Sequence, residues 1–176
     1  SIILVYVVTR TCSDAKRLND VMATFCLVCA IFVSVAIFEY VKVWLVYTGF
    51  AAVWEIPSQG LYLFRDGALR AQASTGHSLV LGYLLAVAVG FWLHLESRLP
   101  TRTYRILGIA GLGIGLIATM SRGPWLTAVL IYALYLLVNK GGVLALFKQI
   151  AIATPFVIVL LLTPLGPKVI DKLPFV

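Results

Sequence analysis

Long apolar runs recur along this chain, and short clusters of charged and aromatic residues separate them. A helix of ~20 apolar residues crosses the ~30 Å hydrocarbon core of a bilayer. In lipid, a helix of this kind satisfies its own backbone hydrogen bonds. The pattern predicts an all-α fold, a polytopic bundle of transmembrane helices with about five complete spans. These spans are expected at positions 21–38, 78–95, 103–120, 124–138 and about 143–163.

Residues 1–8 form a further apolar run that is too short to cross a bilayer. It lacks the basic start and the cleavage site of a signal peptide. We expect it to be the end of a truncated N-terminal helix. Because the chain also stops soon after the last apolar run, residues 1–176 are interpreted as a single transmembrane domain from a longer protein.

The composition agrees with a membrane protein and supplies an orientation. Apolar residues make up 61% of the chain and charged residues 12%, whereas a soluble domain has about 25% charged residues. Basic residues concentrate in the loops at 10–20 and 96–105, and cytoplasmic loops favour Lys and Arg. We therefore place these two loops in the cytoplasm, and the loops that alternate with them along the chain on the outer face. Orientation and anionic lipid account for the formal net charge of +7, so no nucleic-acid partner is expected.

The outer loop, at about 39–76, is the least regular part of the chain and is rich in aromatic residues. Trp and Tyr favour the membrane–water boundary, so its first part, 42–54, fits an amphipathic helix in the interface. The same segment is apolar enough to enter the membrane and return, or to cross it. A full crossing would reverse every later helix. The loop also carries Arg65, a supporting candidate for the site described next.

A first polar tract precedes the span at 78–95. If residues 68–82 are helical, Arg70, Ser74 and His77 fall on one face of that helix. A cationic or titratable side chain beside a membrane span marks a functional site by default. The alternative is that Arg70 contacts lipid phosphate and His77 caps a helix.

A second tract, Ser121-Arg122-Gly123-Pro124, turns the chain between two spans. Pro124 suits the first position of the next helix. Arg122 would lie at that helix N-terminus, where unpaired backbone N–H groups favour an anion, and its forked donors suit phosphate oxygens. We expect Arg122 and Arg70 to bind a diphosphate. The supporting residues are Ser121, Ser74, Arg65 and His77, and His77 is expected to position the substrate rather than transfer a proton. The alternative is an interfacial arginine that holds the hairpin against lipid headgroups.

Other motifs are weak. Cys26 and Cys29 have redox or metal spacing but lie within an apolar run with no further ligand, so they are interpreted as packing residues. The Gly111-x-Gly113-x-Gly115 run lacks the strand-then-helix context of a dinucleotide site. No metal and no cofactor are expected.

The order and spacing of the two tracts resemble the bacterial O-antigen ligase and O-antigen polymerase superfamily. The matching residues are Arg70 with Gly76-His77 and Leu81-Gly82, and the later Thr119-x-Ser121-Arg122-Gly123. The resemblance covers most of this chain but only the middle of such a protein, which has about a dozen helices. A large periplasmic loop follows in that family, and here it would begin at about 164–176. The histidine taken to act in catalysis lies in that loop, so the catalytic residue is expected outside this chain and is not His77.

The resemblance implies a multi-pass protein of the bacterial inner (cytoplasmic) membrane that is active on the periplasmic face. The expected reaction moves a glycan from undecaprenyl diphosphate to an acceptor hydroxyl, without a metal. The acceptor is lipid A-core in a ligase and another lipid-linked glycan in a polymerase. Negative charge grows on the leaving diphosphate, and fixed cationic donors stabilise it. Arg122 and Arg70 are the candidates for this role, and the fragment alone is expected to be inactive.

Two other classes of function remain open at this point. A transporter of an anionic solute would use Arg70 and Arg122 to line a pathway, although transporters often show internal repeats and broken helices near the midplane. A purely structural membrane subunit would leave both arginines unexplained.

Overall fold

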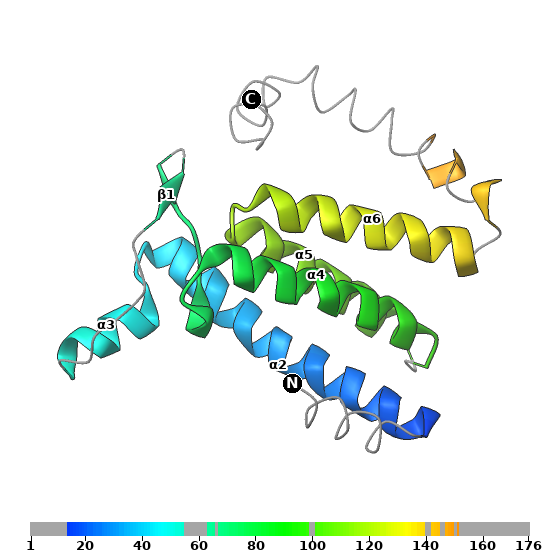
Figure 1. Ribbon diagram of the computed structural model, residues 1–176, viewed down its shortest axis with the longest axis horizontal. Helices are drawn as coiled ribbons and strands as arrows, with labels where there is room; N and C mark the ends of the chain where they lie inside the picture. The colour runs from blue at the N-terminus through cyan, green and yellow to red at the C-terminus, as the bar shows by residue number, and fades with distance from the viewer. Residues whose placement is uncertain are drawn as a thin grey trace, which may run out of the picture.

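The computed structural model describes residues 14–54, 63–65, 67–98, 101–139, 142–144, 147–149 and 151. The truncated helix predicted at 1–8, most of the span predicted at about 143–163 and the loop predicted at 164–176 lie outside these residues. The described part of the chain is mostly helical, with one small hairpin (Figure 1). Its elements are α2 (Ala15–Lys42), α3 (Val46–Val53), β1 (Phe64–Arg65), β2 (Ala68–Leu69), the 3-10 turn η1 (Ala73–Thr75), α4 (Ser78–Leu95), the 3-10 turn η2 (Glu96–Arg98), α5 (Arg102–Ala118) and α6 (Arg122–Asn139).

Each of the first four predicted spans is a helix. Two of these helices, α2 and α4, are long and apolar enough to cross a membrane. α5 has 17 residues and opens with Arg102 and Arg105, and the apolar part of α6 is Arg122–Val138. The described residues therefore contain two helices that pass as complete spans, rather than the five that the sequence predicts for the whole chain.

The outer surface of the bundle is apolar. Leu27, Ile31, Val129 and Leu130 are each more than half exposed, and only 22% of the apolar window of α2 is buried. Soluble monomers rarely expose large contiguous apolar patches. The two apolar helices and the exposed side chains beside them favour a membrane protein, in which lipid would cover these side chains.

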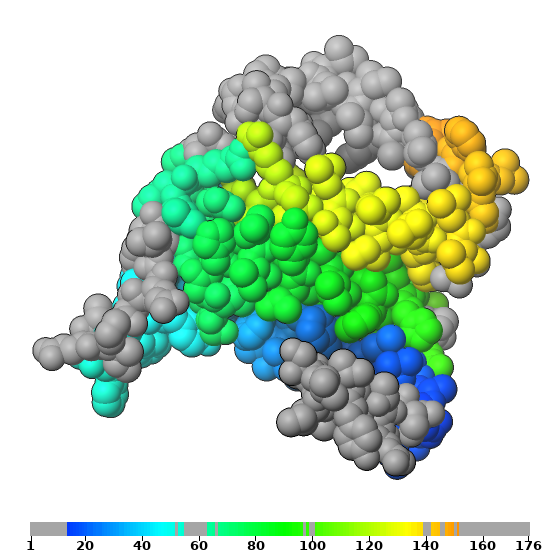
Figure 2. Space-filling model, viewed as in Figure 1, coloured from blue at the N-terminus to red at the C-terminus, as the bar shows by residue number. Residues whose placement is uncertain are grey.

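α4 lies at the centre of the bundle, packed against α2, α5 and α6, and α4 and α6 run side by side in the space-filling view (Figure 2). Its buried residues Leu81, Leu85 and Ala88 belong to the core cluster. Small residues let the helices approach closely. A Cβ added at Gly115 of α5, for example, would lie 2.6 Å from Cγ2 of Val33 on α2.

Within the segment at 42–54, α3 has eight residues, and eight helical residues rise only ~12 Å. This helix is too short to cross a bilayer, so the segment fits an interfacial or a re-entrant course. Val43 ends α2 in a left-handed conformation, with φ 53°. Before α4, β1 and β2 form an antiparallel pair, in which Phe64 pairs with Leu69 and Arg65 with Ala68. This hairpin was not expected in a chain predicted to be all-α.

Two contacts join helices at the end of the bundle that lies away from α3 and the hairpin. His94 Nε2 lies 3.3 Å from Asn19 Oδ1, joining α4 to the start of α2. The Tyr135 hydroxyl of α6 donates to Glu96 Oε1 across 2.8 Å. The basic segments around Lys16–Arg17 and Arg98–Arg102 therefore share one end, as the assignment of both to one side of the membrane requires.

Candidate anion-binding site at the arginine end of the bundle

The two polar tracts meet in space. The Arg70 Nη2 group donates to Ser121 Oγ across 2.8 Å, and its Nε donates to the Thr119 carbonyl across 3.4 Å. The backbone N–H of Ala71 donates to the Ala118 carbonyl at 3.0 Å. The loop before α4 is thus bound to the turn between α5 and α6, and Arg70 lies at the same end of the bundle as Arg122.

The turn that receives Arg70 is closely built. α5 ends at Ala118, and the Thr119 hydroxyl donates to the Leu116 carbonyl at 2.8 Å. Met120 then adopts a left-handed conformation with φ 48°. The Ser121 hydroxyl donates to the Thr119 carbonyl at 3.1 Å while it accepts from Arg70. Thr119 and Ser121 are both buried, so this turn presents a fixed acceptor to the arginine.

A close helix contact supports the same arrangement. A Cβ added at Gly82 of α4 would lie 2.6 Å from Pro124 Cγ and 3.3 Å from Thr119 Oγ1. Glycine is therefore needed where α4 passes the start of α6. Pro124 is the third residue of α6, not the first as the sequence predicted. Its missing N–H still falls among the first four donors of the helix, which have no intrahelical partner.

Arg122 is the first residue of α6, and its side chain is exposed. A helix N-terminus carries partial positive charge and backbone N–H donors that suit an anion. The predicted placement of Arg122 at the N-terminus of a helix is thus confirmed. A full guanidinium charge is added at that point, beside the turn that holds Arg70.

Arg65 also lies close enough to act on Arg70 through its charge. Burial lowers the pKa of the Arg70 guanidinium from its ordinary value, and the positive charge of Arg65 lowers it further. Arginine nevertheless stays protonated in proteins, so two cations are held near one another on the hairpin side of the site. An anionic ligand would relieve this repulsion.

Residues 68–82 do not form the continuous helix that would place Arg70, Ser74 and His77 on one face. Ala68 and Leu69 form β2, Gly76 takes φ 71°, and α4 begins only at Ser78. The chain therefore makes no helical stripe of Arg70, Ser74 and His77, and the side chains of Ser74 and His77 are both exposed.

His77 is instead the N-cap of α4. Its Nδ1 accepts from the backbone N–H of Leu79 at 3.2 Å, which satisfies one of the donors that a helix leaves unpaired at its start. The interpretation of His77 as a helix cap is confirmed. Its role in positioning a substrate has no support from these contacts.

Sequence reasoning missed Glu39, a fully buried carboxylate near the end of α2. Its two oxygens accept from the backbone N–H groups of Val46, Gln72 and Ala73 at 3.1, 2.8 and 2.8 Å. The available signal was its position. A carboxylate at the end of a long apolar run is expensive and marks function by default.

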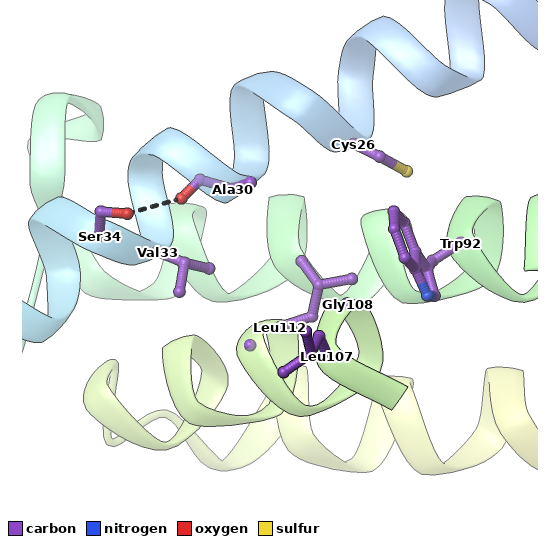
Figure 3. Close-up of a pocket in the computed structure, with 9 residues that line it drawn as sticks. Cys26, Ala30, Val33, Ser34, Trp92, Leu107, Gly108 and Leu112 are labelled. Carbon is purple, nitrogen blue, oxygen red and sulfur yellow. Dashed lines mark hydrogen bonds between the residues drawn. The ribbon is translucent and has the colours of Figure 1, made fainter. Parts of the chain in front are cut away.

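A separate cavity of about 270 Å³ lies between α2, α4 and α5 (Figure 3). Its lining is mainly apolar, with Val33, Trp92 and Leu112 among the residues that face it, and it includes none of the predicted site residues. Cys26 also lines this cavity.

The sulfur atoms of Cys26 and Cys29 lie 3.7 and 4.0 Å from backbone carbonyls of α4, as packing residues would. Within the described residues, no three His, Cys, Asp or Glu side chains gather into a metal site.

Comparison with known proteins leaves the site to be judged on its own geometry. No protein-family model, no curated protein and no solved structure matches this chain.

Proposed function

We propose that this chain is part of a membrane glycan transferase of the O-antigen ligase type. In this proposal the enzyme moves a glycan from undecaprenyl diphosphate to an acceptor hydroxyl of lipid A-core, at the periplasmic face of the bacterial inner membrane. The observation that carries the proposal is the hydrogen bond from Arg70 to Ser121. It unites two tracts, 51 residues apart, that resemble the superfamily in order and spacing.

The site suits a lipid-linked diphosphate in its position and its charge. Arg65, Arg70 and Arg122 lie at one end of an apolar bundle. A lipid diphosphate places its charge at headgroup depth and its tail against apolar helices. Arg122 is exposed, so it is the candidate for direct contact with the phosphate oxygens. Arg70 is half-buried and bonded to the turn, so it supplies a fixed positive charge and orients Ser121.

These residues would act on the leaving group rather than on the acceptor. As the glycosidic bond to the diphosphate breaks, negative charge grows on the phosphate oxygen. Donors already fixed in place stabilise this charge without reorganising. Activation of the acceptor hydroxyl needs a base, and the resemblance assigns that task to a histidine in the downstream loop. No step of the proposed chemistry uses a metal or a cofactor.

Two alternatives differ in what they require. A polymerase of the same superfamily would use the same diphosphate site with a lipid-linked glycan as acceptor. A transporter of an anionic solute would need polar groups along a path through the bundle. The face of α4 that packs on its neighbours instead carries Leu81, Leu85 and Ala88, and Arg70 lies in the loop that precedes α4. These observations favour a transferase over a transporter.

The test is glycan transfer by the full-length protein, using a purified undecaprenyl-diphosphate-linked donor and a lipid A-core acceptor. Arg122→Ala should lower turnover per inserted molecule ~100-fold, because one preorganised contact to the developing charge is removed. Arg122→Lys should keep part of the activity, since it retains the charge but loses the two-pronged contact.

Arg102→Ala is the matched control. Arg102 is also exposed and also opens a helix, α5, but it lies at the opposite end of the bundle. It should transfer glycan at the wild-type rate. Wild-type turnover in Arg122→Ala would refute the diphosphate role, and activity with a lipid-linked glycan but not with lipid A-core would identify the polymerase.

A further inference from the structure

Glu39 joins three segments of the chain through one side chain. Its Oε2 accepts from the N–H groups of Gln72 and Ala73, and its Oε1 accepts from the N–H of Val46, the first residue of α3. The side chain is 0% exposed. A buried carboxylate is costly unless its charge is hydrogen-bonded, and bonds from backbone N–H groups to a carboxylate are among the stronger hydrogen bonds.

The position of Glu39 brings no benefit to its own helix. It lies in the last turn of α2, where the helix macrodipole disfavours negative charge. The backbone carbonyl of Glu39 already ends the helix by accepting from the N–H groups of Val43 and Trp44. The carboxylate is therefore explained by the loops that it holds and not by the stability of α2.

The backbone that receives the carboxylate has a special shape. Gln72 has φ −125° and ψ −23°, and Ala73 has φ 46°. The successive N–H groups of these two residues donate to one carboxylate oxygen, Oε2 of Glu39. Alanine seldom adopts a positive φ. The bonds from Glu39 offset this cost, so the carboxylate fixes a conformation that the sequence would otherwise avoid.

The same short segment carries Arg70. On one side, Glu39 holds residues 72 and 73. On the other side, Ala71 and Arg70 donate hydrogen bonds to the turn at 118–121. We propose that Glu39 is a positioning residue for Arg70, because it fixes the loop that places the guanidinium against Ser121. The consequence for ligand binding rests on the proposed function, whereas the coupling between Glu39 and the Arg70–Ser121 contact does not.

Ligand binding gives the first test, with undecaprenyl diphosphate as the probe and full-length protein in nanodiscs of uncharged lipid. Glu39→Gln keeps the shape of the side chain but places an NH2 donor where a carboxylate oxygen accepts. At least one hydrogen bond from a backbone N–H group is therefore lost. This substitution should weaken binding about tenfold in the wild-type background and have little effect in Arg70→Ala, as coupled residues do. Asp20 is an exposed carboxylate on the same helix, so the control variant Asp20→Asn should leave binding unchanged in both backgrounds. An equal loss in both backgrounds would overturn the proposal and leave a general structural role.

A second measurement does not need the ligand. Melting temperatures of Glu39→Gln, Ser121→Ala and the double variant should be non-additive, and amides 71–75 should exchange faster with deuterium in Glu39→Gln. If the wild-type protein does not bind the diphosphate, the proposed function fails, but a non-additive melting cycle would still support the positioning role. If the changes in melting temperature of the two single variants simply add in the double variant, the positioning role of Glu39 is refuted, whether or not the protein binds the diphosphate. Should Glu39→Gln not fold, Glu39→Asp keeps the charge, is one methylene shorter, and enters the same cycle.

Discussion

The guanidinium of Arg70 donates to the hydroxyl of Ser121 across 2.8 Å, although 51 positions separate the two residues. Ser121 is 1% exposed and Arg70 half-buried, so solvent screens this contact less than it screens a surface pair. Ser121 at the same time donates to the Thr119 carbonyl, which fixes the direction of its lone pairs. The contact therefore links the loop before α4 to the turn before α6 with a defined geometry.

Removal of this acceptor should be measurable. Ser121→Ala leaves a half-buried cationic donor without its side-chain partner, and a hydrogen bond to a charged group contributes about 1.5 kcal/mol or more. We expect a fall in the free energy of unfolding of about 1.5 kcal/mol, seen as a lower Tm in detergent. Ser34→Ala is the control, because Ser34 is exposed and bonds only one turn back to the Ala30 carbonyl. Equal Tm values for Ser121→Ala and the wild type would show that the contact is not formed.

The approach of α4 to α6 predicts a second effect. In Gly82→Ala the new methyl carbon would lie 2.6 Å from the ring of Pro124, which cannot move aside as a flexible side chain would. Overpacking of this kind costs about 1–3 kcal/mol, and the shift should also disturb Thr119 beside it. Gly113→Ala is the matched control, since nothing lies within 4 Å of a Cβ there. Chemical denaturation that ranked Gly113→Ala as the less stable variant would contradict the described packing.

The sequence predicts the helices well because their boundaries depend on local signals. The span predicted at 78–95 coincides with α4, Ser78–Leu95, since an apolar run there follows Gly76 and a capping residue. The shared end of the two tracts was also predictable. Alternate loops lie at the same end of a helical bundle, so the sequence placed Arg70 and Ser121 at one end, and the structure adds their direct contact.

The conformation of the loop between α2 and α4 was not predictable in the same way. The bonds from Glu39 reach residues 33 and 34 positions away, and they depend on a left-handed alanine that no propensity favours. The hairpin is a different case, because its signal was present. An Asp-Gly pair between two short apolar segments is a strong sequence signal for a two-residue hairpin turn, and Gly67 has φ 76°.

The capping role of His77 leads to a third prediction. His77→Ala removes the acceptor for the Leu79 N–H and should destabilise the protein by about 1 kcal/mol. His77→Asn should restore most of this loss, because Asn is among the best N-cap residues. Neither variant should remove a limb from the pH–rate profile of glycan transfer, since a cap takes no part in proton transfer. Loss of a limb in both variants, with unchanged Tm, would instead identify His77 as an acid or base.

The orientation of the bundle gives the last prediction, and it decides on which face the arginines act. Thr101 lies in the basic loop before α5, and Ser74 lies in the loop that carries Arg70; both side chains are exposed. In a variant without native cysteines, Ser74→Cys should react with a membrane-impermeant thiol reagent in intact cells with a permeabilised outer membrane. Thr101→Cys should react only after the inner membrane is opened, because Lys and Arg are retained on the cytoplasmic side. Reaction of both positions in lysed membranes shows that each thiol is accessible. The reverse pattern in intact cells would place Arg70 and Arg122 in the cytoplasm, where a periplasmic transfer reaction has no access to them.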